Sequence, residues 1–279
     1  MGLVDYSDSE EEDAAPKSKR RRLSNVRENA LPPLPAGFRD LYSSTVRTST
    51  QDDPALHGGR KRVTPHVAGN WPTHVYLDWS PTPKEYELLS NILGEIRKTS
   101  TSQNDVQSLL ENDLGVQLPL HVSLSRPLAL KTNQKDEFVS KLEKAIGEAS
   151  VRAFEVQPLE LVWHPNEHRT RWFLVLRLQR PAGDELKNLL KTCNGLAKSL
   201  DQPLLYAEGH NEDSNAFHVS IAWSLKPEGR KGADTGPSPQ NVSAESLEKL
   251  KAFRVEFSDV KVRIGQDVRS VALRSSRKG

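Results

Sequence analysis

The sequence predicts an α+β fold with two pseudo-symmetric lobes of antiparallel sheet and flanking helices around a central groove. One observation is that segments alternating between apolar and polar residues, as strands do, recur between segments with apolar residues at helical spacing. A second is that the triplet His-Val-Ser occurs twice, at 121–123 and 218–220, each time in a strand-like run that follows a helix-like one. Repetition of this kind indicates two similar units that contribute equivalent strands.

The first unit consists of two predicted strands and two predicted helices. Residues 73–79 (THVYLDW) alternate as a strand, and 82–100 carry a proline at an early helical position and apolar residues at helical spacing. Residues 118–125 (LPLHVSLS) are predicted to form a strand, and 133–150 an amphipathic helix.

The second unit repeats this order and adds a closing segment. Residues 154–178 are predicted to form two strands around the turn HPNEHR, 182–200 a third helix and 217–223 (FHVSIAW) a strand. The remaining predictions are a flexible surface loop rich in Gly, Pro and Ser at 226–241, a short helix at 243–251 and a strand pair at 253–265.

Residues 1–55 are predicted to be disordered, and residues 56–279 to form the folded domain. This N-terminal segment contains the acidic block SDSEEED, the basic block KSKRRR at 17–22 and the proline-rich LPPLP. Such segments bury too little apolar surface to offset the entropy of an ordered chain. The basic block is typical of a nuclear-localisation signal, so the expected location is the nucleus.

The composition excludes several kinds of protein. The single cysteine, Cys193, excludes an internal disulfide and a multi-cysteine zinc site, which suits a reducing compartment. No run of 18 apolar residues is present, so we expect no membrane span, and the first residues lack the apolar core of a signal peptide. A net charge of +2 does not by itself argue for a nucleic-acid partner.

The repeated His-Val-Ser triplet is more specific than a chance match. Chance alone gives about one His-x-Ser/Thr in a chain with eight histidines, and His168 with Thr170, in a polar turn, is read as that accident. The other two triplets are identical and lie in apolar alternation. We refer to their four polar residues, His121, Ser123, His218 and Ser220, as the His/Ser quartet.

The quartet predicts acid–base chemistry on a phosphodiester. Residues i and i+2 of a strand share a face, about 6.5–7 Å apart, so each strand directs an imidazole and a hydroxyl into the same space. If the two strands face each other, one histidine can accept the proton of a 2′-hydroxyl while the other protonates the leaving 5′-oxygen. The serine hydroxyls would hold the non-bridging oxygens. This scheme requires no metal.

Other chemistries fit the sequence less well. A zinc site needs three or four ligands, and two histidines on separate strands leave it incomplete. A Ser-His-Asp hydrolase would place its serine on a G-x-S-x-G turn, which the sequence lacks. The glycines of HGGR do not form a phosphate-binding loop, because the segment is short and precedes no clear helix.

These residues resemble the 2H phosphoesterase superfamily and, within it, the family of phosphodiesterases that process the 3′ end of U6 small nuclear RNA. The resemblance covers about 57–225 and rests on HGGRKRVTPHVAGNWPTHVYLDW (57–79), HVSLS, NEHRTRWFLVLRL (166–178) and FHVSIAW. It implies a 2H phosphoesterase catalytic domain and a 3′-to-5′ exoribonuclease that trims oligouridine and leaves a 2′,3′-cyclic phosphate or a 3′-phosphate. It implies His121 and His218 as catalytic residues, Ser123 and Ser220 as phosphate-binding residues, and neither metal nor cofactor.

The same resemblance implies a tyrosine that stacks on a terminal base, for which Tyr206 is the candidate although it lies twelve residues before His218, farther than in the family. It also favours His218 as base and His121 as acid. His74 is interpreted as structural, because no Ser or Thr follows two residues later. We expect an RNA 3′ end as partner, a monomeric chain and no membrane partner. The alternatives are a 2H-type cyclic phosphodiesterase on small nucleotides, a ligase-like 2H protein and an inactive RNA-binding adaptor.

Overall fold

The computed structural model describes residues 69–99, 106–112, 114–167, 169–206, 217–225, 239 and 242–275. The predicted disordered head at 1–55, the basic block within it and nearly all of the predicted loop at 226–241 lie outside these residues. Among the helices within these ranges, none is long and apolar enough to cross a membrane.

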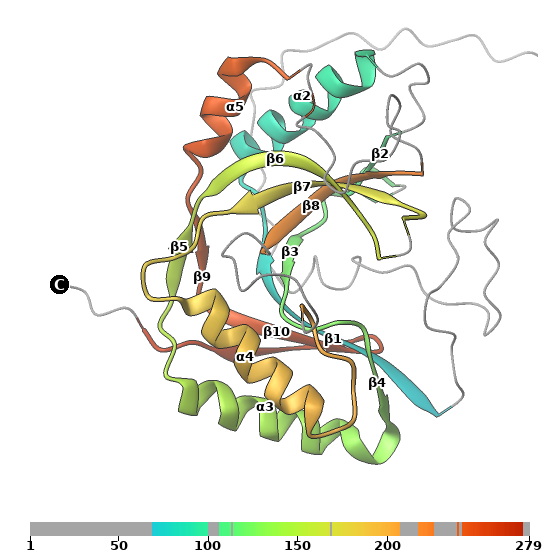
Figure 1. The fold of residues 1–279 in the computed structure, drawn as a ribbon, viewed down its shortest axis with the longest axis vertical. Coiled ribbons are helices and arrows are strands. Elements are labelled where there is room, and N and C mark those ends of the chain that lie inside the picture. The colour runs from blue at the N-terminus through green and yellow to red at the C-terminus, as the bar shows by residue number, and fades with distance from the viewer. Residues whose placement is uncertain are drawn as a thin grey trace, which may run out of the picture. The chain divides into compact units, whose positions relative to one another are not determined.

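Nine of the described strands form one sheet whose strand pairs are antiparallel (Figure 1). Seven of them lie in the order β11-β10-β1-β3-β8-β7-β6, while β2 pairs with β8 and β4 with β1. Their bounds are β1 Asn70–Trp79, β2 Gln107–Ser108, β3 Leu120–Ser123, β4 Leu128–Lys131, β6 Pro158–Pro165, β7 Trp172–Leu178, β8 His218–Ser224, β10 Asp259–Ile264 and β11 Asp267–Ala272. A separate two-stranded sheet pairs β5 Phe154–Val156 with β9 Val255–Phe257.

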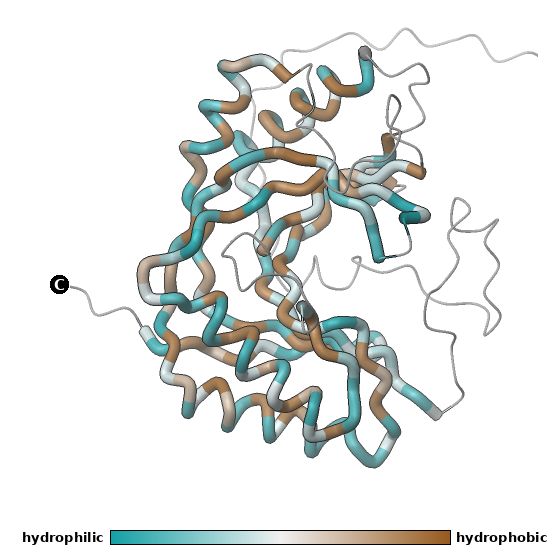
Figure 2. Tube along the Cα trace, in the orientation of Figure 1, coloured by the Kyte–Doolittle hydropathy of each residue, from teal (hydrophilic) through white to brown (hydrophobic). Residues whose placement is uncertain are grey.

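The helices flank this sheet in two pairs, and the predicted α+β fold class is confirmed. α2 (Pro83–Thr99) contacts α5 (Ala244–Lys251), and α3 (Lys135–Ala149), which follows the 3₁₀ turn η2 (Thr132–Gln134), contacts α4 (Glu185–Lys198). In Figure 1 the first pair lies beside β6, β7 and β8, and the second beside β1, β4 and β10. Figure 2 shows hydrophobic residues recurring along α3 and α4 with hydrophilic residues between them, as expected of amphipathic helices.

The start of α2 follows from its first residues. Pro83 occupies the first helical position, where its missing N–H breaks no helical bond. The Thr82 backbone N–H donates to the Glu85 carboxylate at 2.7 Å, and the Glu85 N–H donates to the Thr82 hydroxyl at 3.4 Å. These reciprocal bonds form a capping box, which the sequence TPKE specifies.

The central strands divide the sheet into an apolar and a polar face. Val75 and Leu77 of β1, Val122 of β3 and Val219 of β8 are each at most 1% exposed. Since side chains alternate along a strand, the residues between these four point to the opposite face. The apolar core thus holds the neighbouring polar side chains on one surface of the sheet.

The strand predictions differ from the structure in several places. The segment 154–178 forms β5, β6 and β7 rather than two strands, and β2, β4 and β11 were not predicted. The predicted strand pair at 253–265 forms β9 and β10, but β9 pairs with β5, and β10 lies between β1 and β11. The two His-Val-Ser strands are neighbours in one sheet instead of facing each other. Alternation fixes which side chains share a face, but it does not determine which strands pair.

Candidate active site

The structure brings the four residues of the His/Ser quartet together. β3 and β8 are antiparallel neighbours with Val122 opposite Val219. In this register His121 lies opposite Ser220, and Ser123 lies opposite His218. Because the two valines are buried on the apolar face, all four quartet side chains lie on the polar face.

The quartet forms a four-cornered arrangement with the histidines on one diagonal and the serines on the other. Side chains directly opposite on antiparallel strands have Cβ atoms about 4.5–5.5 Å apart, and diagonal neighbours are about 7–8 Å apart. A phosphate over the centre of the quartet would therefore have an imidazole on each of two opposite sides. The hydroxyls would lie at the two remaining sides.

β1 adds a third histidine to this surface. His74 Nε2 lies 3.1 Å from Ser123 Oγ. The His74 ring stacks on Tyr76 with centroids 5.2 Å apart, and it meets the His121 ring edge-on at 5.3 Å. The interpretation of His74 as structural did not include this contact with Ser123. The signal that could have found it is the alternation of His74, Tyr76 and Asp78 along one face of the strand.

The surroundings of His74 and His121 lower the pKa of both rings. Burial lowers the pKa of His74 to about 3, helped by repulsion from the His121 ring once that ring is protonated and by the charge of Arg263. Desolvation, followed by the Arg263 charge, lowers the pKa of His121 to about 4. The surface of His121 is nevertheless open to solvent, so water offsets part of this desolvation. Both rings are neutral at neutral pH in the RNA-free chain.

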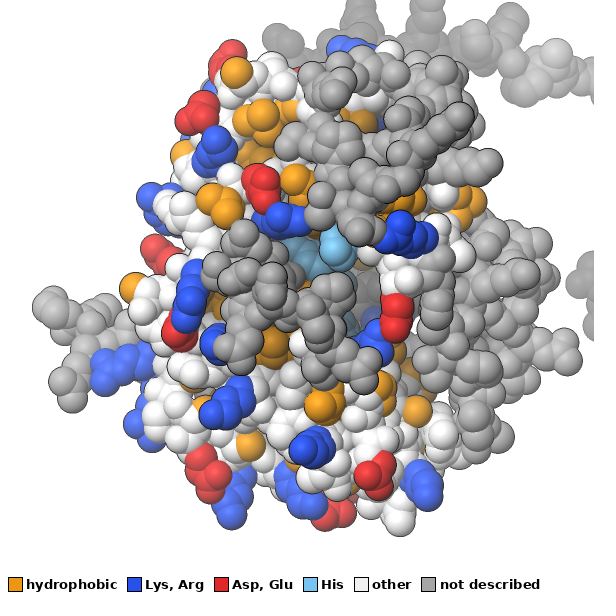
Figure 3. Space-filling model, viewed as in Figure 1, with side chains coloured by type: hydrophobic (Ala, Val, Ile, Leu, Met, Phe, Trp, Pro, Cys, Tyr) orange, Lys and Arg blue, Asp and Glu red, His pale blue; other side chains and the backbone are white. Residues whose placement is uncertain are grey.

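On the side of His218, β6 and β7 contribute an ion pair and a further histidine. Arg177 lies opposite His218 and forms a 2.9 Å ion pair with Glu160, its cross-strand neighbour. The ring of His164, which is exposed, lies 5.7 Å from that of His218. The sequence analysis placed His164 only in a turn, and an isolated histidine there carries no signal for the site. Figure 3 shows histidine side chains near the centre of this face with Lys and Arg side chains beside them.

The ring contact of Tyr206 with Phe217 does not lie on the polar face. Its ring packs edge-on against Phe217 at 6.1 Å, and burial raises the pKa of its hydroxyl to about 12. Phe217 directly precedes His218, so in extended chain its side chain points to the opposite side of the sheet.

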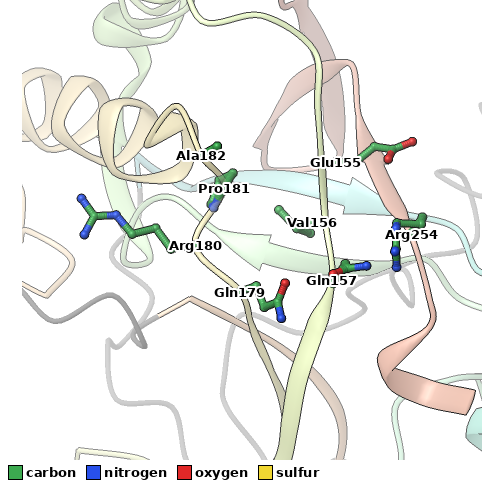
Figure 4. A pocket seen from close by; sticks show the side chains of 8 residues that line it. All are labelled: Glu155, Val156, Gln157, Gln179, Arg180, Pro181, Ala182 and Arg254. Carbon is green, nitrogen blue, oxygen red and sulfur yellow. The ribbon is translucent and has the colours of Figure 1, made fainter. Parts of the chain in front are cut away.

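A cavity of about 300 Å³ lies apart from the quartet, beside the two-stranded sheet (Figure 4). Its lining residues are Glu155, Val156, Gln157, Gln179, Arg180, Pro181, Ala182 and Arg254. Arg180 pairs with Asp184, and Arg254 donates to the carbonyls of Ala252 and Phe253. Because its cations are engaged within the protein and it contains none of the quartet, we place the chemistry at the quartet. In the described part of the chain, no three His, Cys, Asp or Glu side chains gather as metal ligands.

Comparisons with known proteins identify relatives of this chain. The sequence model of the family described as "HVSL: Uncharacterised conserved protein" matches residues 32–272. U6 snRNA phosphodiesterase 1 of Neurospora crassa is 36% identical over 272 residues, covering 86% of this chain and 74% of that protein. The Drosophila melanogaster protein of the same name is 30% identical, covering 81% of this chain and 83% of its own length.

The fold also matches a solved structure. Kluyveromyces marxianus Usb1 superposes with a TM-score of 0.51 at 17% identity, covering 72% of this chain and 98% of that one. A second structure of Usb1, with uridine monophosphate, matches equally well. At this identity the likeness shows the fold alone, whereas the sequence matches carry the family. The chain therefore belongs to the HVSL family, as a relative of the proteins named U6 snRNA phosphodiesterase 1.

Proposed function

We propose that this chain is a metal-independent 3′-to-5′ RNA exonuclease that trims the oligouridine 3′ tail of U6 snRNA. The 2′-hydroxyl of the nucleotide before the scissile bond attacks the phosphate, and the shortened RNA ends in a 2′,3′-cyclic phosphate or, after opening, a 3′-phosphate. The observation that carries the proposal is the His/Ser quartet on one face of two adjacent strands.

The diagonal placement of the histidines supports an in-line displacement. One imidazole takes the 2′-hydroxyl proton as the O2′–P bond forms. The other gives a proton to the 5′-oxygen as the P–O5′ bond breaks on the opposite side. Ser123 and Ser220, on the other diagonal, donate hydrogen bonds to the two non-bridging oxygens, where negative charge is concentrated. The first round releases the terminal nucleoside with a free 5′-hydroxyl. Each later round releases a nucleoside that also has a free 5′-hydroxyl but carries the cyclic phosphate, or its opened 3′-phosphate, formed in the round before.

We assign His218 as the base and His121 as the acid, in line with the resemblance. An acid must carry a proton, yet the pKa of His121 is lowered to about 4 in the RNA-free chain. The assignment therefore requires bound phosphate to raise the pKa of His121, because a nearby negative charge favours the imidazolium. NMR titration of His121 with and without a non-cleavable uridine dinucleotide tests this. A pKa that stays low when the dinucleotide is bound would reverse the roles of the two histidines.

Tyr206 is proposed, from the resemblance alone, as a residue that stacks on the terminal base, since its contact with Phe217 lies on the other side of the sheet. Stacking contributes about 1–3 kcal/mol per base. Tyr206→Ala should then weaken oligouridine binding while Tyr206→Phe should not. Equal binding by both variants and by the unaltered chain would leave Tyr206 as a packing residue only.

The relatives' names support U6 snRNA as the substrate, and with the basic block at 17–22 they support a nuclear enzyme. Incubation with oligouridine RNA in EDTA tests the function. A ladder of 3′-shortened products is the expected result. Cleavage of cyclic nucleotides alone would indicate a small-molecule phosphodiesterase, and binding without cleavage an adaptor.

A further inference from the structure

We infer that His74 is a positioning residue that holds the Ser123 hydroxyl ready to donate to the phosphate. The inference rests on the proposed function, because it assigns His74 a part in the same reaction. His74 is not placed to touch the reacting atoms itself. It acts through Ser123, its hydrogen-bonding neighbour.

The geometry fixes the His74 ring on two sides. Tyr76 lies directly opposite Ser123 in the register of β1 and β3, and His74 is two residues along the same face. The His74 ring reaches Ser123 Oγ at 3.1 Å while it stacks on Tyr76 at an interplanar angle of 23°. Its contact with the His121 ring is nearly perpendicular, at 82°. A ring held by two aromatic neighbours presents Nε2 to the hydroxyl in one orientation.

The charge state of His74 defines what this bond can do. Burial keeps the His74 ring neutral, and the charge of Arg263, which lies opposite His74 in the register of β1 and β10, acts in the same direction. A neutral ring has one N–H. If Nε2 accepted the Ser123 proton, that hydroxyl could not donate to a phosphate. If Nε2–H donates to Oγ, the hydroxyl proton is free for the phosphate oxygen, and the two bonds polarise each other in the same direction. We assign the second arrangement.

Among the residues that the structure describes, Ser220 has no counterpart to the bond between His74 and Ser123. The residue opposite Ser220 on β7 is Val175, an apolar side chain. Within the described ranges no hydrogen bond of the Ser220 hydroxyl is found, whereas Ser123 has His74. The two phosphate-binding hydroxyls are therefore unequal: Ser123 is oriented before RNA binds, and Ser220 is oriented by the RNA. A His74 substitution should affect catalysis through Ser123 and not through Ser220.

A double-mutant cycle on trimming of oligouridine RNA tests this. His74→Phe keeps a ring of similar size for the contacts with Tyr76 and His121 but removes the N–H, and His74→Gln keeps an N–H near the position of Nε2. Loss of one such hydrogen bond should lower kcat about three- to tenfold in His74→Phe. His74→Gln should stay within about twofold of the unaltered chain. KM should change less than kcat in both variants.

The matched control compares the two serine backgrounds. In Ser123→Ala, His74→Phe should lower kcat no further, because the hydroxyl it orients is gone. In Ser220→Ala, His74→Phe should lower kcat by its full factor. Melting temperatures of all variants check folding. If the Phe variant is unstable, His74→Asn, whose amide is too short to reach Oγ, replaces it in both backgrounds.

Three outcomes separate the claims. The full factor in both serine backgrounds, or equal defects in the Phe and Gln variants, would overturn the positioning role while leaving the proposed function intact. No trimming by the unaltered chain would overturn the proposed function and this inference with it. Dependence on His74 only where Ser123 is present would support both.

Discussion

Acidification should lower the free energy of unfolding of this protein through His74. The direction of this change follows from the pKa of His74 in the folded and unfolded chain. The pKa of His74 is lowered to about 3 in the folded chain, against about 6.5 when unfolded. Between these values the unfolded state binds the additional proton, so stability rises with pH. The neutral His74 ring therefore contributes its full share to the free energy of unfolding above pH 6.5, the pKa in the unfolded chain. This share is lost as the pH falls from 6.5 toward 3.

The magnitude can be worked from these two values. From pH 7 to pH 5, the unfolded histidine becomes almost fully protonated while His74 in the folded chain stays neutral. The linkage relation then gives a loss of at most about 2 kcal/mol in the free energy of unfolding. This is an upper limit, because His74 is crowded by protein yet part of its surface reaches solvent. His121 should contribute in the same direction, and more weakly, since its surface is more open.

The assay is urea unfolding at pH 7 and pH 5 for the unaltered chain and for His74→Gln. The unaltered chain should lose more stability than the variant over this interval, by up to about 2 kcal/mol. Carboxylates contribute equally in both proteins and cancel in the comparison. An identical pH dependence in the two proteins would show that His74 is not held neutral by its surroundings, and the reasoning about its charge state would be refuted.

Three further predictions concern the reaction and the head of the chain. His121→Ala and His218→Ala should each lower the rate of trimming by about 10²–10⁴-fold, with RNA binding largely retained. Ser123→Ala and Ser220→Ala should each slow trimming about ten- to a hundredfold. Single-turnover kinetics measure the rates, and filter binding measures the affinity for RNA. EDTA should leave the rate unchanged, and a loss restored by zinc or manganese would contradict the scheme. Deleting residues 1–55 should leave trimming intact and reduce nuclear accumulation of a fluorescent fusion; a truncated protein that stays nuclear would place the signal elsewhere.

The quartet could be predicted from the sequence because its signal is local. An imidazole and a hydroxyl two residues apart in an apolar strand must share a face, and the identical triplet at His121 and at His218 indicated a common site. The helices were equally local: the capping box at Thr82 and the apolar spacing that follows it specify α2 within the chain itself.

The contacts between strands could not be predicted in the same way. His74 reaches Ser123 only because β1 pairs with β3 in one register, and His164 nears His218 only through the order β8-β7-β6. A strand's pattern states which face a side chain occupies but not which strand lies beside it. For the same reason β9 and β10 were predicted as a pair although each pairs elsewhere.

The central claim is that a 2′-hydroxyl, activated at the His/Ser quartet, is the nucleophile. Mass spectrometry of the shortened RNA and the released product, after trimming of an oligouridine in EDTA, tests it most directly. We predict that every released nucleoside has a free 5′-hydroxyl: uridine in the first round, and uridine with a 2′,3′-cyclic phosphate or its opened 3′-phosphate in later rounds. The shortened RNA should end in the same cyclic phosphate or 3′-phosphate. A 2′-deoxy sugar at the penultimate nucleotide should stop the reaction. Released uridine 5′-monophosphate with a 3′-hydroxyl RNA end, or unimpaired trimming of the deoxy substrate, would mean that water attacks and would contradict the account.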